Sequence, residues 1–182
     1  MILIVDLNWK RNSLSFSEFV SPIISAVEAF EDCEVKHYLD IKPTHLSSYS
    51  KTILSGTPLK DNATLKNAEK FIWLTKFHKP ILGICAGMQT INLVFNEPLK
   101  PCLQVGMAEI KTLRENSLFH GNFNAYTLHN YSVASSQTFE TLAMSAKCIQ
   151  AIKHKQKSIY GLLFHPEVRN PEILKRFLQM EK

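Results

Sequence analysis

Apolar and polar positions in the first half of the chain follow the spacing of strands and helices in turn. An unbroken apolar run, residues 1–5, ends at Asp6, as expected of a strand buried on both faces of a parallel sheet. Between Phe16 and Phe30 apolar residues recur every three or four positions, which is helix spacing, and Pro22 suggests that this helix begins near Ser21. Further strands are predicted at 34–38, 52–54 and 80–85, and further helices at 65–77 and 88–95.

Beyond Pro98 the pattern changes to short strand-like stretches with little helix between them. These stretches are residues 108–113, 124–128, 148–152 and 160–164, and a helix started by Pro171 is predicted to close the chain. No repeat or linker interrupts the sequence. We therefore predict a single domain over residues 1–182, an α/β three-layer sandwich with a mostly parallel central sheet and some antiparallel strands.

Composition fits a soluble globular protein, with 45% hydrophobic and 20% charged residues. No apolar run approaches the roughly 20 residues of a membrane span, so we expect a cytoplasmic protein and no membrane partner. The net charge of +5 is spread along the chain, which argues against a nucleic-acid partner. The densest basic run, residues 153–157, is predicted to be a solvated hairpin turn; a docking surface for an acidic partner is the alternative.

A candidate nucleophile lies in the segment GICAG at residues 83–87. Small residues flank Cys85 at a predicted strand-to-helix junction, which is the pattern of a nucleophile elbow. A helix that starts directly behind the cysteine favours its thiolate. The alternative is that Cys85 is a small buried hydrophobic residue and that the glycines only serve a tight connection.

The strongest candidate for a general base is His165, in the segment FHPE at residues 164–167. It follows an apolar strand, and ligand sites of parallel α/β sheets lie beyond the carboxyl ends of their strands. Glu167 is placed to orient the imidazole and to stabilise its charged form. Taken singly, His165 could be a core histidine and Glu167 a loop carboxylate, and His129 is the chief rival base, although no Pro-Glu follows it.

The other three cysteines, Cys33, Cys102 and Cys148, are scattered and form no CxxC pair. This spacing predicts neither a metal site nor a disulfide framework, and we assign the three residues to packing. No cofactor is expected.

The segments GICAGMQ and FHPE closely resemble class I glutamine amidotransferases, the triad family with a flavodoxin-like fold. The resemblance implies that Cys85, His165 and Glu167 form a catalytic triad. The cysteine would attack the side-chain amide of L-glutamine, the histidine would protonate the departing ammonia, and water would release glutamate from a thioester.

The resemblance also implies an oxyanion hole formed by the backbone amides of Ala86 and Gly56. The segment SGTP at residues 55–58 resembles the family's Ser-Gly-Gly-Pro, with Thr57 in place of the second glycine. Because β-branched residues disfavour positive φ, this replacement bears on any peptide flip in the loop. An ordinary loop after a strand is the alternative.

By the same resemblance, Gln89 helps to hold the amino-acid end of the substrate. The segment of His129, Asn130 and Tyr131 corresponds to the family segment whose backbone meets the α-carboxylate and amine of glutamine. For Gln89, the alternative is a polar residue near a helix N-terminus with no ligand.

Family members pass ammonia to a synthetase, so a separate synthetase subunit is the implied partner. The size of the chain and its FHPE segment are most similar to the separate amidotransferase subunit of archaeal-type GMP synthase, whereas DLNW at residues 6–9 departs from the Asp-Asn-Gly-Gly-Gln expected there. Two alternatives remain at this point: a γ-glutamyl peptide hydrolase with the same triad, and a catalytically silent regulatory subunit.

Overall fold

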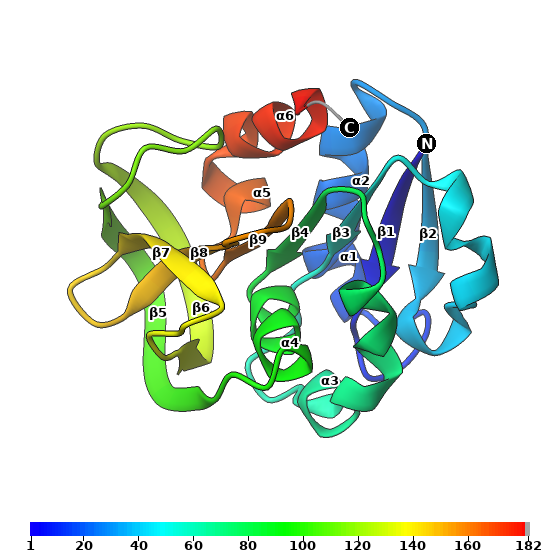
Figure 1. Ribbon diagram of the computed structural model, residues 1–182, viewed down its shortest axis with the longest axis horizontal. Coiled ribbons are helices and arrows are strands. Elements are labelled where there is room, and N and C mark those ends of the chain that lie inside the picture. The colour runs from blue at the N-terminus through cyan, green and yellow to red at the C-terminus, as the bar shows by residue number, and fades with distance from the viewer. Residues whose placement is uncertain (181–182) are drawn as a thin grey trace.

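A computed structural model describes residues 1–180, in which nine strands form one sheet with the order β2-β1-β3-β4-β9-β8-β7-β5-β6 (Figure 1). The first five strands in this order are parallel to one another. The apolar residues of β1, β3, β4 and β9 are buried on both faces, which explains the apolar runs in the sequence, whereas the edge strand β2 is only partly buried. Their bounds are β1 Ile2–Asp6, β2 Cys33–His37, β3 Lys51–Leu54, β4 Ile81–Ile84 and β9 Ile159–Leu162.

The remaining strands pair in antiparallel fashion and extend the sheet beyond β9. They are β5 Leu99–Thr112, β6 Phe123–Val133, β7 Phe139–Met144 and β8 Ile149–His154. The register of β5 against β6 shifts between Pro101 and Gln104, as at a β-bulge. The prediction of antiparallel strands in the second half is confirmed, but β7 was missed and β5 is much longer than the predicted stretch 108–113.

Helices cover both faces of the sheet, so the predicted three-layer α/β arrangement is confirmed (Figure 1). One hydrophobic cluster joins the sheet to helices on the first face, and a second cluster joins it to those on the other face. On the first face lie α1 Ser15–Phe19, α2 Ser21–Glu28 and α6 Pro171–Gln179, and the short α5 Pro166–Arg169 packs against α2 and α6. On the second face lie α4 Ala86–Val94 and the 3-10 helix η3 Ala68–Thr75, and α3 Ala63–Lys66 packs on α4.

One helix prediction is confirmed and another was wrong in detail. The helix predicted to begin near Ser21 is preceded by the separate α1, and Pro22 occupies the first turn of α2 as expected. The helix predicted over residues 65–77 is two segments, because the backbone of Asn67 leaves helical geometry (φ −124°, ψ 34°) and the chain continues as the 3-10 helix η3. Apolar spacing alone does not distinguish these two helix types.

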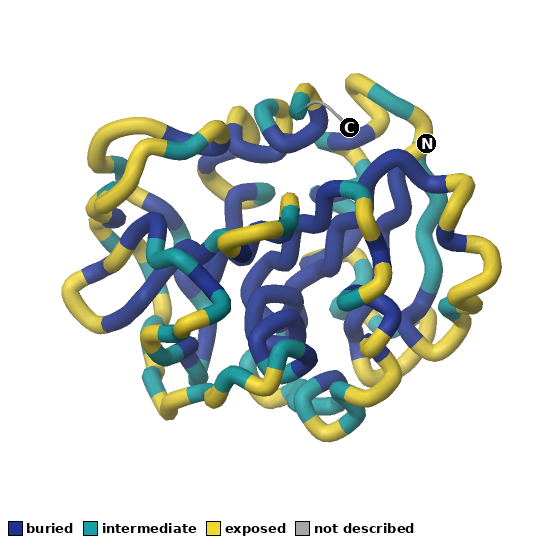
Figure 2. Tube along the Cα trace, in the orientation of Figure 1, coloured by how far each residue is buried: buried dark blue, intermediate teal, exposed yellow. Residues whose placement is uncertain are grey.

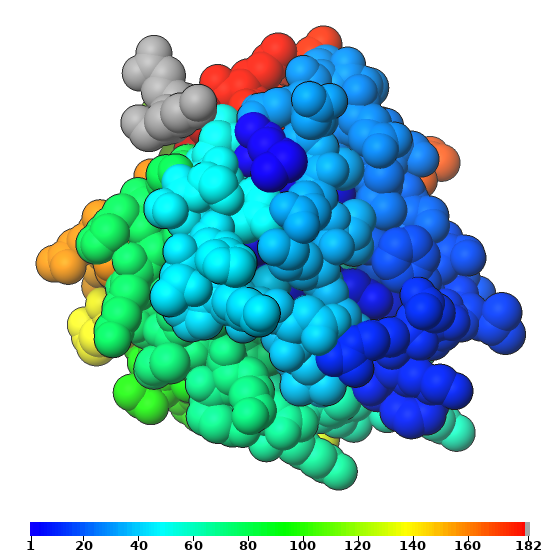
Figure 3. Space-filling view, turned by 90° about the vertical axis from the view of Figure 1, so that its right-hand side faces the viewer, coloured from blue at the N-terminus to red at the C-terminus, as the bar shows by residue number. Residues whose placement is uncertain are grey.

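Burial is concentrated in β1, β3, β4, β9 and α4, whose traces are almost entirely dark blue in Figure 2. The molecular face beyond β2 is built mainly from the N-terminal part of the chain (Figure 3). There η1 Tyr38–Asp40 and η2 Pro43–Ser48 connect β2 to β3. Within residues 1–180, no helix has the length and apolar character needed to cross a membrane.

Candidate active site

The candidate active site lies where three neighbouring parallel strands end. Leu54 of β3 pairs with Gly83 of β4, and Ile84 of β4 pairs with Leu162 of β9, so the three strands end at the same edge of the sheet. Gly56, Cys85 and His165 follow these strands closely. Sheet order therefore brings together segments that are distant in the sequence.

Cys85 occupies a strained turn between β4 and α4. Its backbone angles, φ 49° and ψ −103°, are ones that a non-glycine residue rarely adopts, at a cost of about 1–3 kcal/mol. The Cys85 amide donates to the carbonyl of Leu162 over 2.7 Å, which ties the turn to β9. This conformation is the sharp strand-to-helix turn that the sequence predicts at this position.

The two glycines around Cys85 allow close packing of α4 on the sheet. A Cβ atom at Gly83 would lie 2.6 Å from the carbonyl carbon of Gly87, and one at Gly87 would lie 2.6 Å from the carbonyl oxygen of Leu54. Any side chain at either position would push α4 away from the strands. The helix can therefore begin immediately after Cys85, with its positive end at the sulfur.

The thiol of Cys85 is buried, and its Sγ donates to the carbonyl oxygen of Leu128 in β6 over 3.3 Å. This contact holds the side chain between the end of β4 and the antiparallel half of the sheet.

His165 and Glu167 form a buried ion pair. The Nδ1 atom of His165 lies 2.7 Å from Oε1 of Glu167, and the two side chains are 2% and 0% exposed. Burial lowers the pKa of His165, but its interactions with Glu167 and Cys85 outweigh burial and raise the pKa well above the usual 6.5. Within the described chain, Nε2 of His165 has no hydrogen-bond partner, so it remains available for a proton transfer.

The structure places the two predicted oxyanion residues differently. Ala86 lines the pocket that contains Cys85, together with Thr57. Gly56 instead lies against the imidazole, because a Cβ atom there would come within 2.7 Å of Cε1 of His165. Neither Gly56 nor Thr57 is among the residues of 1–180 with positive φ, so Thr57 is accommodated without strain in this conformation.

Residues 57–62 form one wall of the pocket. Hydrogen bonds hold this wall in place. Asn130 donates from Nδ2 to the carbonyl of Leu59 over 2.9 Å, and the hydroxyl of Thr57 donates to the carbonyl of Asp61 over 3.2 Å. Ser55 adds a further link, since its Oγ accepts from the amide of Leu7 and donates to the carbonyl of Gly56. The roles of Leu59 and Ser55 were not anticipated, although both are in or beside the SGTP segment.

Gln89 joins α4 to the other wall of the pocket. Its Nε2 donates to the carbonyl of Tyr131 over 2.9 Å, and its side chain lines the pocket. Tyr131 does not line the pocket itself, and its backbone carbonyl contacts a residue that does. The predicted group of Gln89, Asn130 and Tyr131 therefore lies together.

His129 lines the same pocket, but its ring is engaged elsewhere. Nδ1 lies 3.0 Å from the carbonyl oxygen of Cys102, and Nε2 lies 3.4 Å from Nε2 of Gln150. Burial lowers the pKa of His129 to about 4, so the ring is neutral near pH 7. Of the two candidate bases, His165 is the one with a carboxylate partner.

The pocket around Cys85 is nearly closed, with a cavity volume of about 10 Å³. That is far less than the roughly 300–1,000 Å³ common for small-molecule sites, so the pocket must widen to admit an amino acid. A larger apolar cavity lies between η2 and η3, where Leu46, Trp73 and Phe77 line it. Its described lining contains no cysteine or carboxylate, so it offers no comparable chemistry.

Comparison with known proteins agrees with this geometry. The sequence model of a family described as glutamine amidotransferase class-I matches residues 16–181. The chain belongs to the class I glutamine amidotransferases. The family consists of enzymes, and the α/β fold described above is the one that the sequence resemblance implied.

Curated relatives of this amidotransferase include proteins of methanogens. The glutamine-hydrolysing subunit of GMP synthase from Methanococcus maripaludis strain S2 is 40% identical over 136 residues, which are 69% of this chain and 70% of the relative. The corresponding protein of Methanocaldococcus jannaschii is 37% identical over 139 residues, 70% of this chain and 72% of the relative.

Solved structures share the fold. A putative GMP synthase subunit from Thermoplasma acidophilum superposes with a TM-score of 0.81 at 23% identity, covering 98% of this chain and 92% of the other. A glutamine amidotransferase from Thermotoga maritima gives a TM-score of 0.71 at 19% identity, covering 98% and 81%. The fold is thus retained where the sequences have largely diverged.

Proposed function

We propose that this amidotransferase hydrolyses L-glutamine to glutamate and ammonia, with Cys85 as nucleophile, His165 as acid and base, and Glu167 as the group that orients His165. The observation that carries the proposal is the buried His165–Glu167 pair, in which Nε2 of His165 is free and the imidazole interacts electrostatically with Cys85, a residue in a strained turn. A cysteine that only packed would need neither the strained backbone nor an adjacent ion pair.

In the first half of the reaction, Sγ of Cys85 attacks the side-chain carbonyl carbon of glutamine and the thiol proton is held on Nε2 of His165. The C–N bond then breaks, and His165 returns the proton to the departing ammonia. The product on the enzyme is a γ-glutamyl thioester. Glu167 stabilises the imidazolium form during both proton transfers.

In the second half, His165 accepts a proton from water as the water attacks the thioester carbonyl. The C–S bond breaks, and glutamate leaves as the proton returns to Cys85. One water is consumed, and one glutamate and one ammonia are formed. The amide of Ala86, at the start of α4, is proposed to stabilise the developing oxyanion together with Gly56 in the opposite loop.

Gln89 and the segment of His129, Asn130 and Tyr131 are proposed to hold the amino-acid end of the substrate. The Gln89–Tyr131 hydrogen bond supports this assignment because it fixes the two walls of the pocket relative to one another. Since the ring of His129 is engaged by Cys102, we assign its contribution to the backbone.

We further propose that the ammonia passes to a separate synthetase subunit of GMP synthase. Relatives at 37–40% identity are named as the glutamine-hydrolysing subunit of that enzyme. An exposed apolar strip on β5, made of Leu103, Val105 and Met107, offers a docking face. Val105 pairs with Leu128, which lines the pocket, so this strip adjoins the candidate active site.

One unbroken sheet over the described residues supports a single domain for residues 1–182. The relatives described above are named for glutamine hydrolysis and not for cleavage of a γ-glutamyl peptide. Hydrolysis of glutamine is therefore the preferred reaction.

Glutamate release from L-glutamine tests the proposal, measured for the chain alone and with the synthetase subunit of GMP synthase and its substrates. Cys85→Ala should abolish release, whereas Cys33→Ala, at a half-buried cysteine of β2, should leave it unchanged. Glutamate release by a folded Cys85→Ala variant would refute the proposed nucleophile. Release that other synthetases stimulate equally would refute the proposed partner.

A further inference from the structure

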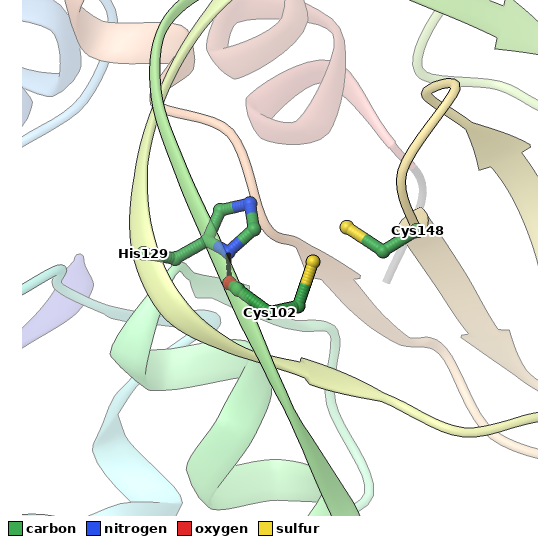
Figure 4. Close-up of side chains that lie close together, drawn as sticks. All are labelled: Cys102, His129 and Cys148. Atoms are coloured by element: carbon green, nitrogen blue, oxygen red, sulfur yellow. Dashed lines mark hydrogen bonds between the residues drawn. The ribbon is translucent and has the colours of Figure 1, made fainter.

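A second cluster of reactive side chains lies behind the wall of the candidate active site. Cys102, His129 and Cys148 come from β5, β6 and the turn before β8, and one potential ligand atom from each lies within 4.8 Å of the others. Figure 4 shows the two sulfur atoms pointing toward one another, with the imidazole beside them. Their sequence separations, 27 and 19 positions, match no local metal-binding motif.

The tautomer of His129 suits a ligand. Because a backbone carbonyl can only accept, the 3.0 Å contact with the carbonyl oxygen of Cys102 requires Nδ1 of His129 to carry the proton. Nε2 then has a free lone pair. Metal-binding histidines commonly donate their other ring N–H to a carbonyl in this way, which fixes the orientation of the ring.

Four atoms that can accept a hydrogen bond surround Nε2 of Gln150, which lies beside the cluster. His129 Nε2 lies 3.4 Å from it, Cys148 Sγ 3.3 Å, Ser145 Oγ 3.2 Å and Gln104 Oε1 3.1 Å. An amide group has two hydrogens and cannot serve four acceptors. The Oε1 atom of the same fully buried side chain has no partner in the described structure.

Rotation of the Gln150 amide would exchange its oxygen and nitrogen, which have nearly the same shape. The oxygen would then lie 3.3–3.4 Å from Cys148 Sγ and His129 Nε2. The amide of Gln104, whose Oε1 is 3.1 Å away, would rotate as well and donate to this oxygen. Zinc bonds of about 2.3 Å to sulfur and about 2.0–2.1 Å to nitrogen or oxygen place tetrahedral ligand atoms about 3.3–3.8 Å apart. The distances from Gln150 to His129 and to Cys148 are therefore close to those of a tetrahedral site.

We propose that Cys102, His129 and Cys148 bind one thiophilic divalent cation, of which Zn²⁺ is the probe, with Gln150 Oε1 as the fourth ligand. Two thiolates balance the charge of the cation, so the site is neutral in its buried surroundings. Closing gaps of up to 4.8 Å requires a movement of about 1 Å by a cysteine side chain. The cation would fasten the bulge of β5 and the β7–β8 turn to β6, directly behind the pocket wall.

Binding of Zn²⁺ and of the spectroscopic probe Co²⁺ to the full chain, reduced beforehand, tests the site. We expect one Co²⁺ per chain with thiolate-to-metal absorption, displaced by Zn²⁺. Cys102→Ser and Cys148→Ser should each weaken binding at least 100-fold. Cys33→Ser and Cys85→Ala should bind as the parent protein does, which separates this site from the catalytic cysteine and keeps the test independent of glutamine hydrolysis.

X-ray absorption of the zinc-loaded parent protein provides a measurement that needs no variant. Two sulfur ligands and at least one imidazole nitrogen are expected. The proposal is overturned if binding is not stoichiometric, if either serine variant binds normally, or if the absorption spectrum contains one sulfur ligand or none. A Cys102–Cys148 disulfide that forms in preference to the metal site under reducing conditions would also overturn it.

Discussion

Replacing Glu167 with Gln should expose how much the buried carboxylate contributes to catalysis. Glutamine has nearly the same shape, and its side-chain oxygen can still accept from Nδ1 of His165, so the hydrogen bond of 2.7 Å is kept while its charge is lost. Because both side chains are almost wholly buried, water cannot replace that charge. A hydrogen bond to a charged group contributes about 1.5–3 kcal/mol and a neutral one about 0.5–1.5 kcal/mol, so the difference of about 1–1.5 kcal/mol corresponds to a roughly 5- to 12-fold loss of kcat/KM.

The same change should alter the pH dependence. In the folded protein the pKa of His165 is raised above 6.5 despite burial, chiefly by its interaction with Glu167 and also by that with Cys85. The charged imidazole therefore stabilises the folded protein fully below pH 6.5, and this contribution to the free energy of unfolding is lost as the pH rises through the raised pKa. Removing the Glu167 charge lowers the pKa of His165, so the charged imidazole should be lost at a lower pH.

The assays are glutamate release and the rate of alkylation of Cys85 as a function of pH. The alkaline limb of each profile should move to lower pH in Glu167→Gln, while Glu172→Gln, an exposed carboxylate in α6, should match the parent protein. Unchanged kcat/KM in Glu167→Gln, or an alkaline limb that moves to higher pH, would refute the assigned role.

Three further substitutions test the packing of the site and of the core. Gly56→Ala places a Cβ atom 2.7 Å from Cε1 of His165, so at least a tenfold loss of glutamate release is expected with little change in KM; unaltered activity would contradict that contact. Asn130→Ala removes the hydrogen bond to Leu59, so limited proteolysis should show faster cleavage near residue 59. The free energy of unfolding should fall by about 0.5–1.5 kcal/mol. Equal cleavage rates would contradict the proposal that this hydrogen bond holds residues 57–62 in place. Phe177→Ala should lower the free energy of unfolding in urea by about 3–5 kcal/mol, because Phe177 is fully buried, and a loss under about 1 kcal/mol would refute its place in the core.

Local sequence predicted the elements that carry the chemistry with good accuracy. Apolar runs located β1 and β4, and the small residues around Cys85 predicted a sharp turn into a helix. These features depend on residues that are neighbours in the chain: strand alternation, helix spacing and glycine's lack of a side chain. The α/β arrangement followed from their order.

Other features depended on residues that are distant in the sequence. The strand β7 was missed because its apolar residues gain their partners only from β8 and β5. The division at Asn67 followed from local backbone geometry that apolar spacing does not record. The assignment of Cys102 and Cys148 to packing did not foresee that the bulge of β5 and the β7–β8 turn bring them beside His129.

The sequence by itself determined which groups are present and which local turns they occupy, since a nucleophile elbow and a His-Pro-Glu segment are encoded within a few residues. Only the tertiary structure decided that the ends of β3, β4 and β9 adjoin, because strand order results from packing a whole sheet between two layers of helices. That packing also left Nε2 of His165 free and turned the ring of His129 toward Cys102. The orientation of each imidazole depends on partners supplied by the fold.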